Sequence, residues 1–122
     1  MDDERSLYWI GSSLDDLRSF PEDVIDIIGY ALHLAQHGGR HPDAKPLKGF
    51  QGASVLEVVE NFNGDTYRVV YTVRCRDAVY VLHAFQKKSR RGIKTPKLDL
   101  DLIRRRLSAA QAWHDRTGLD HE

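Results

Sequence analysis

Basic and aromatic side chains gather in the β-rich middle of the sequence and in the loop that follows it. Lysine and arginine offer cations to phosphates, and aromatic rings offer surfaces on which bases can stack. Such a set can also cleave RNA without a metal, because the 2′-hydroxyl attacks the adjacent phosphate while cations stabilise the charge and a Tyr, His or Lys moves protons. The residues concerned are Lys48, Arg68, Tyr71, Phe85, Lys87, Lys88, Arg90 and Arg91.

Two polar residues stand inside apolar runs. Arg68 lies in the middle of "TYRVVYTVR" (66–74), where a rigidly held guanidinium could bind a phosphate with two donors or could lie along a solvent-facing sheet surface. His83 lies in "AVYVLHAFQ" (78–86). Because histidine titrates near neutral pH, His83 could act as a general acid or base, or it could be a hydrogen-bonded structural residue.

The alternation of side chains along a strand predicts which residues share a face. In the first of these two strands, one face carries Tyr67, Val69, Tyr71 and Val73, and the other carries Arg68, Val70, Thr72 and Arg74. In the second strand, one face carries Val79, Val81, His83, Phe85 and Lys87, and the other carries Tyr80, Leu82, Ala84, Gln86 and Lys88.

Other chemistries find little support in the sequence. His33 and His37 are spaced to pair on a helix face, but they lack a third ligand at a metal-site spacing and the glutamate of the zinc-protease motif. Glu57 and Glu60 fall on opposite strand faces and cannot flank one bond together. No phosphate-binding glycine loop, nucleophile elbow or dinucleotide fingerprint is present, so we expect no metal and no nucleotide cofactor.

The elements that must position these residues form an α+β domain. A short strand at "LYWIG" precedes two helices, over about 12–20 and 21–37, and residues 40–54 read as a loop. Three strands follow at 55–62, 66–74 and 78–86, and Asn63-Gly64 favours a tight hairpin between the first two. A last helix spans 98–114. We expect the helices to cover one face of a curved antiparallel sheet of three to four strands.

Composition is that of one soluble domain. The 122 residues are 41% hydrophobic and 30% charged, with no apolar run long enough to span a membrane and no signal-peptide pattern. The single cysteine, Cys75, suits a reducing cytoplasm. The net charge of zero hides a segregation, because residues 1–39 carry −6 and residues 40–97 carry +7. A basic segment of this kind attracts polyanions even when the whole molecule is neutral.

"YRVVY" (67–71) followed by "HAFQKKSRRGIKTP" (83–96) resembles the phage-derived, HigB-like branch of the RelE/ParE toxin superfamily. The resemblance covers residues 7–114 of a single domain that spans 1–122, and it implies a RelE-like fold with two N-terminal helices on the sheet and a C-terminal helix. It also implies a toxin of a type II toxin–antitoxin system. Such a toxin is cytoplasmic, cleaves mRNA on the ribosome and so inhibits translation, and is neutralised by a helix-turn-helix antitoxin.

The resemblance also implies roles for single residues. Arg68 is similar to a phosphate-binding arginine of the sheet, and Lys48 is similar to a loop lysine that faces the same surface. Lys87 and Lys88 are similar to the basic residues at the end of the last strand. Proton transfer would fall to Tyr71 or His83, with general attraction of RNA left to the loop arginines, Arg90 and Arg91. The superfamily also contains gyrase poisons of the same fold, so a ParE-like gyrase inhibitor or another toxin that only binds its target is the alternative. A third possibility is an inactive homologue that serves as an RNA- or protein-binding module.

Overall fold

The computed structural model describes residues 4–50, 52, 54–87 and 95–117. Along the chain, the elements are β1 (Ser6–Trp9), α1 (Ser13–Arg18), α2 (Glu22–Gln36), β2 (Ala44–Pro46), β3 (Val55–Phe62), β4 (Asp65–Thr72), β5 (Ala78–Lys87) and α3 (Lys97–Thr117). The α+β class, the two N-terminal helices and the C-terminal helix are confirmed. No helix in the described part of the chain is long and apolar enough to cross a membrane.

The sheet is larger than predicted and is not purely antiparallel. Its five strands lie in the order β1-β5-β4-β3-β2, and the N-terminal strand runs parallel to β5. The additional strand, β2, falls inside residues 40–54, which we expected to form only a loop. The predicted hairpin is present between β3 and β4, where Asn63 and Gly64 have φ angles of 52° and 86°. These positive values suit the two-residue turns that match strand twist.

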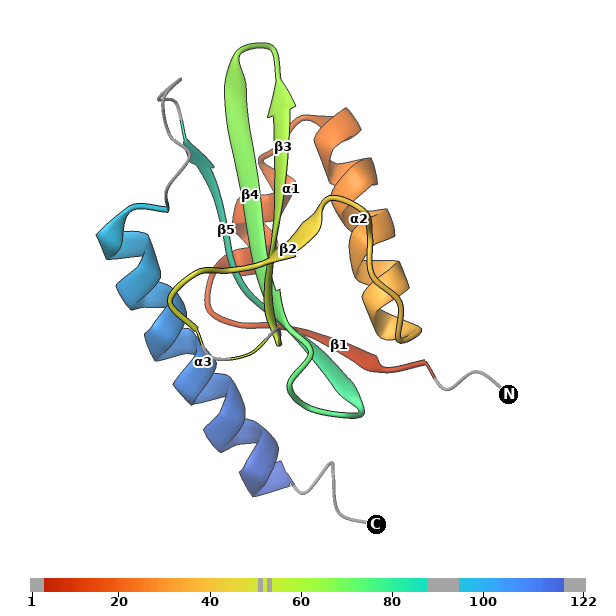
Figure 1. Cartoon of the computed structure of the whole chain (residues 1–122), viewed down its shortest axis with the longest axis vertical. Coiled ribbons are helices and arrows are strands. Elements are labelled where there is room, and N and C mark those ends of the chain that lie inside the picture. The colour runs from red at the N-terminus through yellow and green to blue at the C-terminus, as the bar shows by residue number, and fades with distance from the viewer. Residues whose placement is uncertain (1–3, 51, 53, 88–94, 118–122) are drawn as a thin grey trace.

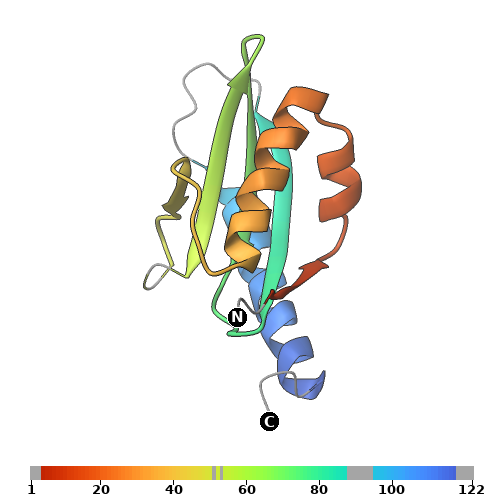
Figure 2. The same ribbon diagram turned by 90° about the vertical axis from the view of Figure 1, so that its right-hand side faces the viewer.

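Helices cover both faces of the sheet, so the expectation that all of them share one face is wrong. Figure 1 shows the sheet between α2 and α3, and in Figure 2, where the molecule is turned by 90°, α2 lies in front of the sheet and α3 behind it. Two apolar cores result. On the α2 side, Val24 and Ile28 pack with Val58 and Val69. The core on the α3 side is built from Ile103 and Ala110 of α3 with Val55, Val70, Tyr80 and Leu82 of the strands.

A β-bulge at Leu82 changes the faces of β5. Tyr71 pairs with Val81, whereas Val70 pairs with His83, so Leu82 has no opposite residue in β4. Its carbonyl instead accepts a hydrogen bond of 2.9 Å from Arg106 Nη1 of α3. A bulge re-aims every side chain beyond it. Strict alternation therefore misplaces part of this strand, since His83 points to the α3 side while Val81 packs into the α2-side core.

Candidate nucleic-acid interface

Strand register brings polar residues of four strands into two adjacent rows on the α3 side of the sheet. Lys45 pairs with Glu57, Glu57 with Val70, and Val70 with His83. In the next row Val59 pairs with Arg68, which pairs with Phe85. Directly paired residues lie on the same side of a sheet. We call this surface the Arg68 face and define it by Lys45, Glu57, Val59, Arg68, His83 and Phe85, with Thr95 just before α3 and Asp99 in the first turn of that helix.

The bulge is what assembles the Arg68 face. Without it, the residues of β5 that pair with Val70 and Arg68 would be shifted by one position, and a shift of one residue moves side chains to the opposite face. With it, His83 and Phe85 lie beside the arginine. Lys87 pairs with Thr66 in the following row and comes to the same side. The β3–β4 hairpin extends beyond the start of α3 in Figure 1, and α3 therefore does not cover the whole sheet.

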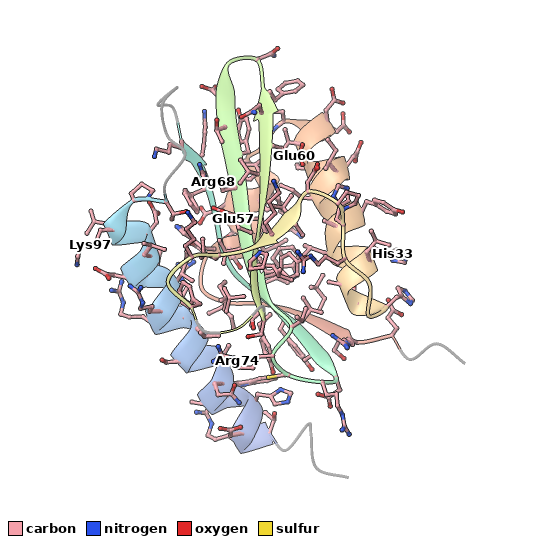
Figure 3. All side chains as sticks on the ribbon, in the orientation of Figure 1. His33, Glu57, Glu60, Arg68, Arg74 and Lys97 are labelled. Atoms are coloured by element: carbon pink, nitrogen blue, oxygen red, sulfur yellow. The ribbon has the colours of Figure 1, made fainter. Side chains whose placement is uncertain are left out.

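Arg68 is held by an ion pair inside this face. Its Nη1 donates to Glu57 Oε2 over 2.7 Å, and the side chains of Arg68 and Glu57 are only 3% and 15% exposed. Thr95 Oγ1 donates to the same carboxylate oxygen at 3.0 Å, and Figure 3 shows the Arg68 and Glu57 side chains next to each other. Charge-assisted hydrogen bonds of this kind fix both partners. The guanidinium is therefore rigidly oriented, as the sequence suggested, but it is not a freely exposed cation.

His83 forms the second fixed pair. Its Nε2 lies 2.7 Å from Asp99 Oδ1, and its ring stacks on Phe85 with centroids 4.5 Å apart and planes 19° apart. Asp99 lies in the first turn of α3, where the helix dipole favours a negative charge. When Asp99 is ionised, Nε2 donates this hydrogen bond. Nδ1 is buried and has no hydrogen-bond partner among the described residues.

Tyr71 is not part of this face. It points to the α2 side, is 0% exposed and lies in the core with Val69 and Val79. Burial raises the pKa of its phenol to about 12, an effect that the nearby positive charge of Arg40 partly opposes. At neutral pH Tyr71 is therefore an uncharged phenol, separated from Arg68 by the sheet itself.

Of the remaining basic residues predicted to bind RNA, two lie within the described part of the chain and three lie outside it. Lys48 is exposed in the turn after β2, and the neighbouring Phe50 carries the Arg104 guanidinium of α3 at 5.2 Å from its ring centroid, so this turn lies along α3. Lys87 ends β5 and is half-buried. Lys88, Arg90 and Arg91 lie outside the described residues.

The structure adds residues that sequence reasoning missed. A pocket of about 320 Å³ lies beside Arg68 and is lined by Asp43, Lys45, Glu57, Val59 and Arg68. Alternation could have placed Glu57 on the face of Arg68 once the register of the hairpin was fixed by its turn. Nothing local in the sequence pairs Asp99 with His83, because that contact depends on how α3 is placed. Among the described residues, no group of three or more His, Cys, Asp or Glu side chains could hold a metal ion.

Comparison with known proteins agrees with this architecture. The model of the phage-derived Gp49-like protein family (DUF891) matches residues 15–108. The isolated RelE toxin of E. coli is 17% identical, with 83% of this chain and 97% of that chain covered and a TM-score of 0.53. A mutant of E. coli RelE in the free state is 18% identical, with 66% and 81% covered and a TM-score of 0.51.

A third solved structure is the toxin–antitoxin complex RelBE2 from Mycobacterium tuberculosis, which is 17% identical over 73% of this chain and all of that chain, with a TM-score of 0.45. A comparison with curated proteins finds no match. The likeness to the two RelE structures is one of fold, and the family match covers most of the sequence. The chain therefore has a RelE-like fold and belongs to the phage-derived Gp49-like family.

Proposed function

We propose that this protein is the toxin of a type II toxin–antitoxin system, of the HigB-like branch, and that it cleaves mRNA on the ribosome. The observation that carries the proposal is the Arg68 face, where a fixed guanidinium, a His–Asp pair and an aromatic ring share one side of a RelE-like sheet. The two E. coli relatives of this fold are described as toxins. Cations with aromatic surfaces suit single-stranded RNA.

The reaction that fits these groups is an internal phosphoryl transfer. The 2′-oxygen forms a bond to the adjacent phosphorus and loses its proton to a base, while the bond from phosphorus to the 5′-oxygen breaks and that oxygen takes up a proton. Arg68 and Lys87 would stabilise the charge on the phosphate oxygens in the transition state. His83 would transfer a proton, with Asp99 fixing its ring orientation.

The proposed toxin would act together with the ribosome and would be controlled by an antitoxin. The ribosome would supply an ordered single-stranded mRNA to a small protein whose own binding face is shallow. A helix-turn-helix antitoxin would neutralise the toxin in the cytoplasm of the host cell. Phe85 would stack on a base beside the scissile phosphate, which is a common mode of single-strand recognition.

The test is mRNA cleavage by antitoxin-free protein in a translation extract, followed by primer extension. Lys87→Ala should lower the cleavage rate by about 10-fold to 100-fold, in line with the loss of one group that stabilises transition-state charge. His83→Gln should lower it by about 100-fold, as expected for a general acid–base group. Arg74→Ala is the matched control, because Arg74 is an exposed cation just beyond the other end of β4 (Figure 3) and should leave the rate unchanged.

The same preparation separates this proposal from the gyrase alternative. Intact mRNA on translating ribosomes, together with inhibition of DNA gyrase supercoiling, would show that the protein acts as a ParE-like gyrase inhibitor. Cleavage that survives both Lys87→Ala and His83→Gln would show that the chemistry lies elsewhere on the molecule.

A further inference from the structure

The pocket beside Arg68 has a lining that differs from that of a phosphate site. We call it the Lys45 pocket, lined by Asp43, Lys45, Glu57, Val59 and Arg68. Its volume of about 320 Å³ is at the small end of ligand pockets and accommodates one planar base. We propose that the Lys45 pocket binds a guanine base of the RNA next to the phosphate held at Arg68. This inference rests on the proposed function and names the nucleotide that the site selects.

The charges of the pocket favour a neutral ligand over a phosphate. Two carboxylates, those of Asp43 and Glu57, face two cations, and one of these cations already pairs with Glu57. A phosphate in this space would be repelled by both carboxylates. A nucleobase carries no net charge, and its flat surface can lie against the aliphatic side chain of Val59. The carboxylates then require hydrogen-bond donors from the base.

Free hydrogen-bonding capacity is available on the two sides of the pocket. Glu57 Oε2 accepts from Arg68 and Thr95, whereas no described residue donates to Oε1. Lys45 is exposed and forms neither an ion pair nor a hydrogen bond with any residue that the structure describes. The pocket thus presents acceptors from Glu57 and Asp43 together with the ammonium donor of Lys45.

Guanine matches this pattern better than the other bases. Its N1–H and N2–H₂ groups are adjacent donors on one edge, and O6 and N7 are adjacent acceptors on the next edge. Carboxylates can take the first pair and a lysine the second. Adenine and cytosine each offer one exocyclic amino group, and uracil offers a single ring N–H. Only guanine offers two adjacent donors to the carboxylates and two adjacent acceptors to Lys45.

The position of the pocket relates the base to the scissile bond. Lys45 lies on β2 and Arg68 on β4, with β3 between them. Neighbouring strands are about 4.8 Å apart, and Lys45 and Arg68 pair with β3 residues two positions apart, so the two side chains arise about 12 Å from each other. This distance suits a phosphate at Arg68 and the base of a directly adjoining nucleotide in the pocket. Phe85 lies on the opposite side of Arg68 and is placed for the other neighbouring base.

Binding of 2′-O-methyl RNA hexamers measured by fluorescence anisotropy tests the inference, because these oligonucleotides lack the attacking hydroxyl and cannot be cleaved by this route. One central position carries guanine, inosine or adenine. Inosine keeps O6 and N7 but lacks the N2 amino group. The wild-type protein should bind the guanine hexamer about 10-fold more tightly than the inosine hexamer, and more tightly still than the adenine hexamer, because one paired base contact contributes about 1–3 kcal/mol.

Two substitutions in the pocket separate the two edges of the base. Asp43→Asn should abolish most of the preference for guanine over inosine, and Lys45→Met should abolish most of the preference for guanine over adenine. Glu60→Gln is the control for Asp43, because Glu60 lies near Asp43 and interacts with it electrostatically but does not line the pocket, and it should leave both preferences intact. Arg74→Met controls for the loss of one positive charge. Urea unfolding of each variant verifies that it remains folded.

Failure of this inference differs visibly from failure of the proposed function. Equal affinity for the three hexamers, or a guanine preference that survives both Asp43→Asn and Lys45→Met, would overturn the guanine pocket even if mRNA is cleaved. A guanine preference lost in these variants would support the pocket even in a protein that leaves mRNA intact, and the proposed nuclease function would then be the part that is wrong.

Discussion

The Arg68–Glu57 ion pair should contribute to the free energy of unfolding, so a variant of Arg68 can lose mRNA cleavage simply because it is less stable. In Arg68→Gln, the mostly buried carboxylate of Glu57 loses the charge that compensates it. Breaking a buried pair from one side costs about 3–5 kcal/mol, and the partial exposure of Glu57 reduces our expectation to about 2–3 kcal/mol. Glu57→Gln removes compensation from an arginine that is even less exposed, so we expect about 3 kcal/mol.

The double variant Arg68→Gln with Glu57→Gln carries no uncompensated charge. It should therefore lose only about 2–3 kcal/mol, well below the sum of the two single losses, which gives a coupling energy of about 3 kcal/mol. Urea denaturation with global fitting measures all four proteins, and thermal unfolding should show the same order. If the two losses add to within about 0.5 kcal/mol, Arg68 and Glu57 do not interact as the structure indicates.

Comparing these four proteins also separates an effect of Arg68 on stability from an effect on cleavage. The double variant should regain stability but should still fail to cleave mRNA, because the guanidinium is absent. A folded double variant that cleaves at the wild-type rate would show that Arg68 serves the fold and not the reaction.

Two further predictions concern groups near the Arg68 face. Burial and the neighbouring Asp43 raise the pKa of Glu60 from 4.5 to about 7, so the stability contributed by protonated Glu60 is complete below pH 4.5 and is lost as the pH rises through 7. After discounting for partial exposure, Glu60→Gln should raise the free energy of unfolding by about 1–2 kcal/mol at pH 8 and leave it nearly unchanged at pH 4.5. An equal effect at both pH values in urea titrations would contradict this prediction. Arg106→Met removes the donor to the buried carbonyl of Leu82 and should lower the free energy of unfolding by about 1–3 kcal/mol; an unchanged thermal midpoint would show that the bulge does not need this hydrogen bond.

Local sequence patterns predicted the elements whose causes are themselves local. Asn63-Gly64 marks its hairpin because both residues adopt positive φ, and this hairpin fixes the register between β3 and β4. Strand β2 escaped prediction because three residues that end in Pro46 carry no alternation signal. The placement of α3 escaped prediction for a different reason, since helical periodicity shows that an apolar face exists but does not show which side of a sheet will receive it.

In the candidate site, too, local patterns predicted some features, whereas others depended on the assembled fold. Alternation put Arg68 on the face opposite to Tyr71, as the structure has it. The bulge at Leu82 could not be anticipated, because it depends on the pairing between two strands and on a donor from α3. The partners of the key side chains, Glu57 and Asp99, come from a neighbouring strand and from α3, so they required the assembled fold.

The chemistry of the RNA ends shows whether this face cleaves mRNA by attack of the 2′-hydroxyl. The measurement is mass spectrometry of both fragments after a brief incubation of purified protein with ribosome-bound mRNA. We predict a 2′,3′-cyclic phosphate on the upstream fragment and a 5′-hydroxyl on the downstream fragment. A 3′-hydroxyl paired with a 5′-phosphate would mean that water attacks instead, and it would contradict the mechanism assigned to Arg68, Lys87 and His83.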